Sequence, residues 1–403
     1  MISDDITLSN GLRVLTCRRD LGKSAAQLYI RAGLYHGHKP ELAHILEHLQ
    51  ATPAGISDGP LHISYCESNA TTAFDKSMYY YNGLVPEDFD ECARALSNVL
   101  ATCNTEVLER EKQAVIQELT PKDTPESRFY RTLQHLSAPK VALMYDSYDD
   151  RIASIPGTTA DDCKRFFNEA YNPANAILIL AGTLPEKLES IIEPFEALRS
   201  DGVRTADVTW PAQAISDERL VHTEYIQKVN AASIVVLKHA PNYPHTGTYR
   251  EEAGYRALCA YLRNHRGPLH EELRNKRRLC YGFSMNLNEL GPLTFVDFQA
   301  TTSHLDRTGE LIKAYESVLD DIAAKGIPEP FLESHRKGLR IALLGEQHSF
   351  GISDIMDEAM YGLKLNDKVE TYSTIQQADV RLAACALAAQ KSIIGISLPE
   401  KKQ

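Results

Sequence analysis

The chain has 403 residues, 43% of them hydrophobic, which suits two or three domains with buried cores. Its net charge of −11 argues against nucleic acid as the main partner, although residues 274–278 form a local basic patch. We find neither a signal sequence nor an apolar run that could span a membrane, so we expect a cytoplasmic protein without membrane contact. The eight cysteines form no C-x-x-C pair, which favours reduced, buried thiols over a disulfide framework.

A strand-like run at residues 27–31 precedes the most informative segment of the chain, a predicted helix from near Pro40 to near Gln50. Proline suits a first helical turn, and leucine and isoleucine recur at the spacing of an apolar stripe. The opposite side carries His44, Glu47 and His48, an H-x-x-E-H motif. Two imidazoles four positions apart project from one face about one turn apart, so both can bind the same ion.

Neutral imidazoles beside a carboxylate suit zinc, and a catalytic zinc site needs three protein ligands and one open position. The alternative is a surface helix with scattered histidines, which the amphipathic pattern makes less attractive. The third ligand must come from another segment.

The best source is a strongly helical stretch that begins at Val107 and ends near Pro121. Glu111 and Glu118 are seven positions apart and share a face, but they stand about 10 Å apart along the axis, too far to bind one ion comfortably. One would be the ligand and the other a supporting carboxylate. Taken alone, either glutamate would be an ordinary solvated charge.

Strand-like runs also occur at 176–181 and 231–238, and they alternate with helical segments in both halves of the chain. This alternation predicts an α+β fold with one α/β sandwich in each half. A stretch rich in Gly, Pro and charge, with the sole tryptophan Trp210, separates the halves. We therefore predict an N-terminal domain at residues 1–205, a linker at 206–218 and a C-terminal domain at 219–403.

Several ordered motifs resemble the pitrilysin/insulinase metalloproteases, the family that includes mitochondrial processing peptidase and its bacterial relatives. The resemblance runs through nearly the whole chain. It rests on Leu8-Ser-Asn-Gly-Leu-Arg-Val14, Leu42-Ala-His-Ile-Leu-Glu-His48, Ser68-Asn-Ala-Thr-Thr72 with Asp75 and Tyr79, Tyr171-Asn-Pro-Ala-Asn175 with the strand after it, and Glu272-Leu-Arg-Asn-Lys-Arg-Arg-Leu-Cys-Tyr-Gly282.

The resemblance implies a site with one zinc ion per chain. Its ligands are His44, His48 and Glu118, and Glu111 is the supporting carboxylate of the catalytic set. Glu47 is implied as the general base that takes a proton from zinc-activated water and passes it to the leaving amine.

The same resemblance assigns substrate contacts to two further segments. Asn69 and Ala70 match an edge strand whose backbone pairs with an extended peptide, although a plain edge strand is the alternative. Arg274 and Tyr281 match an R-x-x-x-x-x-x-Y element, in which the guanidinium holds a carbonyl or carboxylate and the phenol donates to the developing oxyanion. Without the other motifs, this basic run would be a solvated helix end.

Some positions depart from the family pattern. Glu41 replaces a glycine before the zinc helix, and Gln50-Ala-Thr-Pro-Ala-Gly55 replaces the segment usual after it. The spacing from His48 to Glu118 is shorter than usual, and the glycine-rich loop before Arg274 is reduced to Arg266-Gly-Pro268. These changes concern substrate access and leave the implied zinc ligands intact.

In the family, each half of the chain is one α/β-sandwich domain, and four such domains make a clamshell peptidase. This chain supplies two of them, so the resemblance implies a homodimer or a heterodimer with a related subunit; two-fold symmetry favours the homodimer. The implied function is a zinc-dependent endopeptidase for unstructured peptides. The alternatives are a leader-peptide protease for one dedicated precursor, working with a partner subunit, and a non-catalytic scaffold subunit.

Overall fold

The computed structural model describes residues 2–20, 22, 24–52, 54–56, 66–138, 147–205, 219–227, 229–241, 248–290, 293–348, 352–362 and 364–400. The linker predicted at 206–218, with Trp210, lies outside these ranges. The chain forms two compact units, each built on its own sheet. The first comprises residues 1–123, 147–209 and 346–360, and the second comprises 124–146, 210–345 and 361–403.

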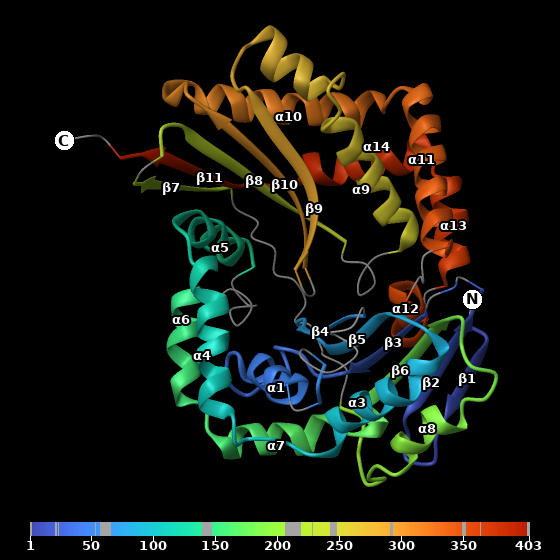
Figure 1. The fold of residues 1–403 in the computed structure, drawn as a ribbon. Helices are drawn as coiled ribbons and strands as arrows, with labels where there is room; N and C mark the ends of the chain where they lie inside the picture. The colour runs from blue at the N-terminus through green and yellow to red at the C-terminus, as the bar shows by residue number, and fades with distance from the viewer. Residues whose placement is uncertain are drawn as a thin grey trace. The chain divides into compact units, whose positions relative to one another are not determined.

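The first unit contains a six-stranded mixed sheet with the order β1-β2-β6-β3-β5-β4 (Figure 1). Its strands are β1 (Asp4–Thr7), β2 (Arg13–Arg18), β3 (Ser24–Ile30), β4 (Glu67–Thr72), β5 (Ser77–Leu84) and β6 (Ala176–Gly182). Only β2 and β6 pair in parallel, and β4 is the last strand at one edge. The strands predicted at 27–31 and 176–181 are therefore confirmed as the central strands β3 and β6.

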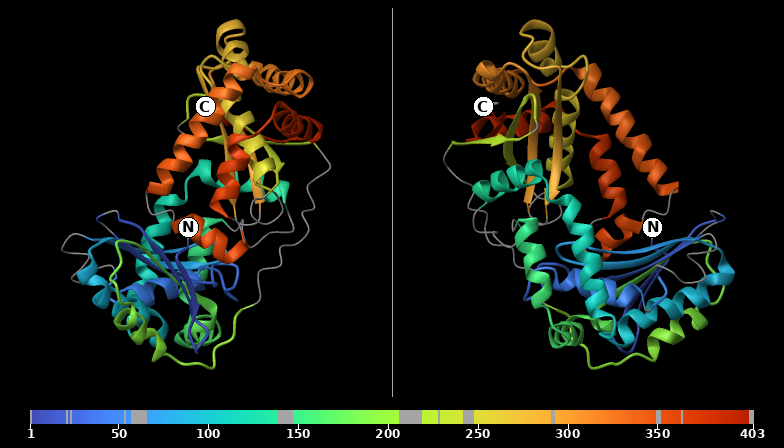
Figure 2. Two further views of the ribbon diagram at one scale, coloured as in Figure 1. Left: turned by 90° about the vertical axis from the view of Figure 1, so that its right-hand side faces the viewer. Right: turned by 60° about the vertical axis from the view of Figure 1, so that its left-hand side comes forward.

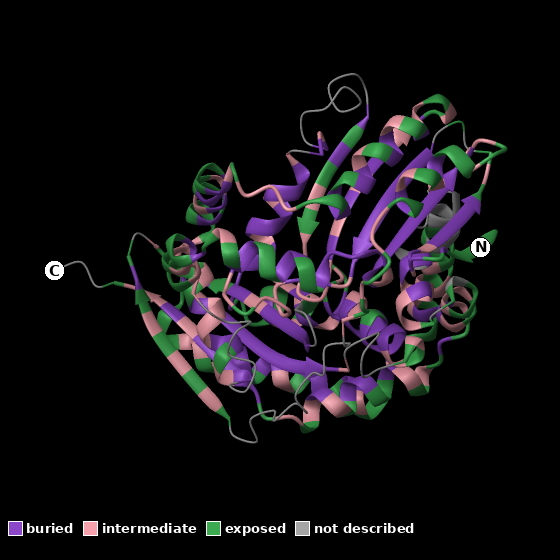
Figure 3. Cartoon of the chain, turned by 90° about the horizontal axis from the view of Figure 1, so that it is seen from below, coloured by how far each residue is buried: buried purple, intermediate pink, exposed green. Residues whose placement is uncertain are grey.

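Both faces of this sheet are covered, which explains why every residue of β3 and β6 is buried (Figure 3). Alternate strand residues point to opposite faces. One face packs on α1 (Leu42–Ala51), α3 (Phe89–Ala101), α7 (Ala160–Ala170) and α8 (Glu189–Glu196). On the other face, Leu15, Tyr29 and Ile179 pack against α12 (Ile352–Tyr361), a helix from late in the chain. Two further helices of this unit are α4 (Leu108–Leu119) and α6 (Tyr148–Ser154).

The second unit contains a five-stranded sheet with the order β7-β11-β8-β10-β9. Its strands are β7 (Leu220–Ile226), β8 (Ala232–Ala240), β9 (Gly282–Leu290), β10 (Leu293–Thr302) and β11 (Ile393–Pro399). The helices of this unit, drawn from two further sides in Figure 2, are α5 (Pro125–Ser137), α9 (Tyr249–Leu262), α10 (Thr308–Lys325), α11 (Glu329–His348), α13 (Leu365–Ser373) and α14 (Gln377–Ala389). The strand predicted at 231–238 is confirmed as β8.

The core of the second unit lies between β8, β10 and the helices α9, α10 and α14. The helix α5 packs against β11, β8 and β7, and it approaches β11 so closely that Leu133 and Phe129 leave no room for a Cβ atom at Gly395. Each unit is thus a sheet with packed helices, and the predicted α+β fold with two α/β sandwiches is confirmed. Among the described helices, none is long and apolar enough to cross a membrane.

Candidate metal centre

The helix predicted near residues 40–50 is confirmed as α1, which begins at Leu42 and ends at Ala51. Its apolar stripe is buried in the core of the first unit through Leu42, Ile45, Leu46 and Leu49. This packing fixes the rotation of the helix and turns the other face, with His44, Glu47 and His48, toward a pocket of about 750 Å³. All of the described residues that line it belong to the first unit.

The second predicted helix, α4, places its two glutamates near different ring nitrogens of the histidines. Glu118 lies at the pocket, with Oε2 at 3.2 Å from His44 Nε2 and 3.6 Å from His48 Nε2. Glu111 lies on the other side of the His48 ring, with Oε2 at 3.3 Å from His48 Nδ1. Their seven-residue spacing does not decide which glutamate faces the Nε2 atoms of the histidines; in the structure Glu118 does.

Each histidine has a carboxylate behind it. His44 Nδ1 donates to Glu41 Oε2 at 2.9 Å, and His48 Nδ1 lies within reach of Glu111 Oε2. A hydrogen bond at Nδ1 fixes the tautomer and leaves the Nε2 lone pair free for a metal. Both Nε2 atoms face Glu118, so His44, His48 and Glu118 each present one ligand atom, all within 4.8 Å of one another.

The donor set fits a zinc ion. Ligands at about 2.0–2.2 Å from a tetrahedral zinc are about 3.3–3.6 Å apart, close to the two histidine–glutamate separations. Two imidazoles and one carboxylate, each histidine backed by a carboxylate, are typical of catalytic zinc sites with one open position. These are the residues that could hold a metal in the described part of the chain.

Glu47 lines the same pocket as the two histidines. Glu47 is only 6% exposed, and Thr72 donates a hydrogen bond from Oγ1 to Glu47 Oε2 at 3.0 Å. Burial raises the pKa of Glu47, although the neighbouring histidines and Thr72 oppose the shift. A carboxylate with a raised pKa and one oxygen already engaged is suited to accept and release a proton.

The charges around His44 act together. Burial lowers the pKa of His44, but hydrogen bonds to Glu118 and Glu41 outweigh burial and raise that pKa to about 9. The hydrogen bond with His44 holds the pKa of Glu118 far below its usual range, with help from Lys122, whose Nζ donates to Glu118 Oε1 at 2.7 Å. The carboxylates of this site therefore stabilise positive charge at the point where the three ligand atoms converge.

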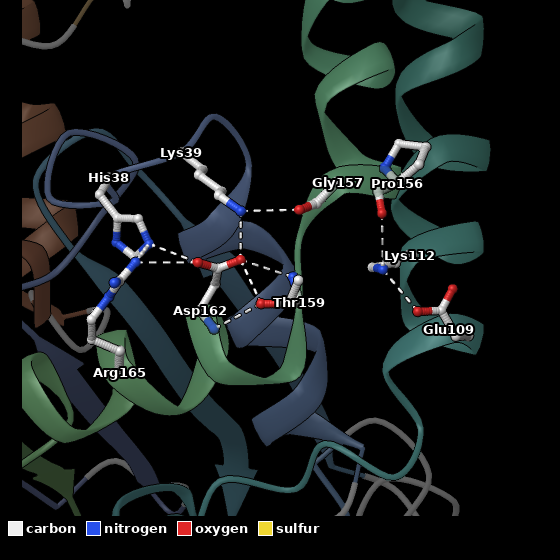
Figure 4. A network of polar contacts seen from close by, with 9 residues as sticks. All are labelled: His38, Lys39, Glu109, Lys112, Pro156, Gly157, Thr159, Asp162 and Arg165. Atoms are coloured by element: carbon white, nitrogen blue, oxygen red, sulfur yellow. Dashed lines mark hydrogen bonds and ion pairs between the residues drawn. The ribbon is translucent and has the colours of Figure 1, made fainter.

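A separate polar network fastens the segment before α1 and the helix α4 to the same turn at residues 155–157 (Figure 4). Lys39 Nζ donates to Gly157 O at 2.9 Å and to Asp162 Oδ2 on α7. Lys112 on α4 donates to Pro156 O at 3.3 Å. The two ligand-bearing helices are thus tied to one shared support, in addition to their direct packing.

The edge strand β4 borders the pocket. Asn69 and Ala70 line it together with His44, Glu47, His48 and Glu118. Asn69 pairs with Tyr80 and Ala70 with Tyr79 of β5, while none of the described strands pairs with the other side of β4. An edge strand beside a pocket can take an extended peptide as an added strand.

Arg274 and Tyr281 lie in the second unit and contact each other. Arg274 belongs to a short π-helical segment, His270–Lys276, and its guanidinium lies 4.5 Å from the centre of the Tyr281 ring. Tyr281 is 83% exposed. The basic run is indeed near a helix end, as the plain alternative held, but its Arg and Tyr side chains are paired in a cation–π contact.

The contacts of Glu41, Thr72 and Arg151 with the site were not predicted from the sequence; Thr72 and Arg151 line the pocket, and Glu41 lies behind His44. Glu41 precedes His44 by three positions, a spacing at which helical side chains meet, so its contact with His44 could have been anticipated. Thr72 ends the strand motif Ser68-Asn-Ala-Thr-Thr72, and nothing in that motif signals its contact with Glu47. Arg151 is 110 positions from Glu41, and no local pattern signals a contact over that distance.

The comparisons with known proteins agree with this architecture. Residues 158–339 match the family described as peptidase M16 inactive domain. This match includes Arg274 and Tyr281 but begins after the ligand residues, so it carries no information about them. A search of curated proteins finds no match.

Solved structures share the fold over the whole chain. A protease from Helicobacter pylori has a TM-score of 0.80 at 19% identity, covering 98% of this chain and 99% of that one. A peptidase M16 inactive domain from Pseudomonas fluorescens has a TM-score of 0.79 at 17% identity, with 100% and 99% covered. The periplasmic protease PqqL from Escherichia coli has a TM-score of 0.72 at 15% identity; 98% of this chain covers 47% of that protein. The fold is therefore that of M16 peptidases.

Proposed function

We propose that the chain is a zinc-dependent endopeptidase that hydrolyses unstructured peptides. The observation that carries this proposal is the convergence of His44, His48 and Glu118 beside the buried carboxylate of Glu47, in one pocket bordered by an edge strand. When bound there, zinc would supply a Lewis acid that polarises a peptide carbonyl and lowers the pKa of water.

The chain's own residues supply the remaining steps. Thr72 holds Glu47 Oε2, and Glu47 Oε1 would take a proton from the attacking water and deliver it to the leaving amine nitrogen. The backbone of β4 at Asn69 and Ala70 would hold the substrate as an extended strand. Main-chain pairing tolerates many sequences but requires an unfolded segment, which is the reason for proposing unstructured peptides as the substrate class.

Arg274 and Tyr281 are proposed as substrate contacts, with Arg274 holding a carbonyl or carboxylate and Tyr281 donating to the oxyanion. Their support is the resemblance of the sequence and their mutual contact. Tyr281 is largely exposed, so its side chain is accessible to a substrate.

A second copy of the chain or a related subunit is proposed to complete the enzyme. The support is that the fold of nearly this whole chain matches less than half of the PqqL protease. We favour a homodimer, because the chain carries both the ligand set and the Arg274/Tyr281 element. A cytoplasmic location is also proposed, on the support that all eight cysteines are free thiols.

A non-catalytic scaffold role is the second candidate. It is favoured by the description of the matched family, an inactive domain, for residues 158–339. The ligand set and Glu47 lie outside that segment, and a scaffold has no need of a buried carboxylate in a pocket with two histidines. We therefore place the peptidase first.

The experiment is cleavage of a mixed library of unstructured peptides by the purified protein with zinc, followed by mass spectrometry, beside Glu47→Gln. We expect the wild type to cleave and Glu47→Gln to retain bound zinc but lose activity by about 10²–10⁴-fold, because the amide cannot accept the proton. Gln113→Ala, at an exposed position of α4, is the control and should keep full activity. Equal cleavage by wild type and Glu47→Gln would contradict the mechanism, and bound zinc without cleavage of any peptide would favour the scaffold.

A further inference from the structure

The residue that precedes the ligand-bearing helix α1 has an unfavourable backbone conformation. Glu41 has φ 58° and ψ 0°, in the left-handed region that residues with a Cβ atom rarely adopt. Within the described ranges, Arg278 is the other non-glycine residue with a positive φ. Glycine would adopt this conformation without cost, so the reason for a glutamate here must lie in its side chain.

Helix capping does not supply that reason. The backbone oxygen of Glu41 accepts the first hydrogen bond of α1 from Ile45 N at 2.8 Å, but the Glu41 side chain makes no hydrogen bond to the helix N-terminus. Residues with short polar side chains are preferred at such a position. The carboxylate is instead buried, with 2% of the side chain exposed, and burial of a charge is costly unless partners compensate.

The partners are one metal-site histidine and one arginine. His44 Nδ1 donates to Glu41 Oε2 at 2.9 Å, and Arg151 Nε donates to Glu41 Oε1 at 2.5 Å. Arg151 comes from α6 and lies over the ring of Tyr148 at 5.2 Å from its centre. Both carboxylate oxygens of Glu41 therefore have a defined partner, and the arginine is itself held in place.

We propose that Glu41 and Arg151 form a positioning pair, which holds His44 in the tautomer and ring orientation that present Nε2 to a metal ion. This inference rests on the proposed zinc site and extends it to residues outside the ligand set. Glu41 orients the imidazole and increases its donor strength, and Arg151 fixes the carboxylate and compensates its buried charge. Glu111 has the corresponding place behind His48.

The chain offers a matched control in the same segment. Lys39, two positions before Glu41, binds Asp162 and Gly157 (Figure 4). Among the described residues, the hydrogen bonds and ion pairs of Lys39 do not include His44. Lys39→Met removes a charged contact of similar kind from the segment before α1. It therefore reports on what general loosening of this segment does to the site.

The experiment measures the zinc dissociation constant by competition with a chelator, and the thermal midpoint of the zinc-free protein. The variants are Glu41→Gly, Glu41→Gln and Lys39→Met. We expect Glu41→Gly to weaken zinc binding by about 10–100-fold, the range for loss of a carboxylate behind a ligating histidine. Glu41→Gln keeps an oxygen that can accept from Nδ1 and should recover part of the affinity. Lys39→Met should lower the thermal midpoint and leave the zinc affinity within about twofold of wild type.

A spectroscopic measurement distinguishes positioning from structural support. In zinc-loaded protein labelled with ¹⁵N-histidine, the His44 Nδ1–H proton should be protected from exchange by Glu41, and Glu41→Gly should abolish that protection. The double variant Glu41→Gly/Arg151→Gln avoids an uncompensated arginine and should show the same loss of zinc affinity.

The outcomes separate the two proposals. If wild type binds no zinc, the proposed function and this inference are both overturned. If wild type binds zinc and Glu41→Gly binds it equally well, the positioning pair is overturned while the peptidase stands. Equal loss of affinity in Glu41→Gly and Lys39→Met would also overturn it, because loosening of the segment would then suffice.

Discussion

Both units of the molecule bury ionisable side chains, but they use them differently. In the first unit, Glu41, Glu47 and Glu111 are buried around two histidines, and their hydrogen bonds converge on one pocket. In the second unit, Lys238 and Asp297 are also buried, but their hydrogen-bond partners are structural groups, such as a helix-end carbonyl and the Asn288 amide. Burial of a charge therefore does not identify a functional site; convergence of several charges on accessible space does.

The contacts of the second unit show what a structural role looks like. Lys238 Nζ donates to the carbonyl oxygens of Leu387 and Gln390, at the end of α14. Such a contact satisfies carbonyl groups that a helix end leaves without partners. Burial lowers the pKa of Lys238 to about 8, because the charged ammonium is less well solvated inside the protein than in water.

The largest expected effect on stability concerns Asp297. Its Oδ2 accepts hydrogen bonds from Tyr130 on α5, Asn288 and Gln299, and the residue is fully buried. Asp297→Ala leaves these donors without their acceptor, and we expect it to lower the free energy of unfolding by about 3 kcal/mol. Urea unfolding measures the change.

Two controls belong with this variant. Asp321→Ala removes one partner of an exposed ion pair with Lys325 and should change stability by less than about 0.5 kcal/mol. The zinc affinity of Asp297→Ala should equal that of wild type. Weakened zinc binding in this variant would show that the two classes of buried charge are not separate.

The opposite pattern is expected for Glu111 in the first unit. Glu111→Ala removes the carboxylate behind His48 and should weaken zinc binding by about 10–100-fold, or about 1.4–2.7 kcal/mol. Gln113→Ala changes an exposed residue of the same helix and should leave the affinity unchanged. Chelator competition measures both. If Glu111→Ala lost stability but kept its zinc affinity, Glu111 would belong with the structural charges.

The smallest effect concerns the pH dependence of stability through His239 of the second unit. Burial lowers the pKa of His239 to about 4, below the value of about 6.5 for an unfolded chain. As pH falls through 6.5, His239 binds a proton in the unfolded chain but stays neutral in the folded protein, so stability is lost toward pH 4. Between pH 7 and 5 this loss amounts to about 1–2 kcal/mol.

The variant His239→Leu removes this proton uptake. Urea unfolding at pH 7 and pH 5 should therefore show a smaller loss of stability in the variant than in wild type. Identical losses in both proteins would mean that His239 titrates normally in the folded state, and that its burial carries no charge penalty.

The sequence predicted the parts of the site that follow from local periodicity. The apolar stripe of α1 and the H-x-x-E-H spacing predicted a packed helix with His44, Glu47 and His48 on its other face. In the structure these three side chains line the pocket, and Glu47 is itself buried. The seven-residue spacing of Glu111 and Glu118 predicted a shared face, but geometry alone could not assign their roles. The choice of Glu118 depended on the resemblance to a family and agrees with the distances.

Contacts between distant segments could not be predicted in this way. An amphipathic pattern shows that a face of a helix is buried, but it does not show what covers that face. The packing of α12 on the sheet of the first unit and of α5 on the sheet of the second are examples. The ion pair between Arg151 and Glu41 is another, because neither residue's neighbours in the sequence indicate the other.

The central claim is that His44, His48 and Glu118 bind zinc, and crystals soaked in zinc test it most directly. Diffraction data collected on both sides of the zinc absorption edge should show one anomalous peak per chain at this site. We predict the peak within about 2.0–2.2 Å of His44 Nε2, His48 Nε2 and a Glu118 carboxylate oxygen, with Glu47 beside it as a non-ligand. A fully occupied zinc elsewhere, or none in the presence of excess zinc, would contradict the account.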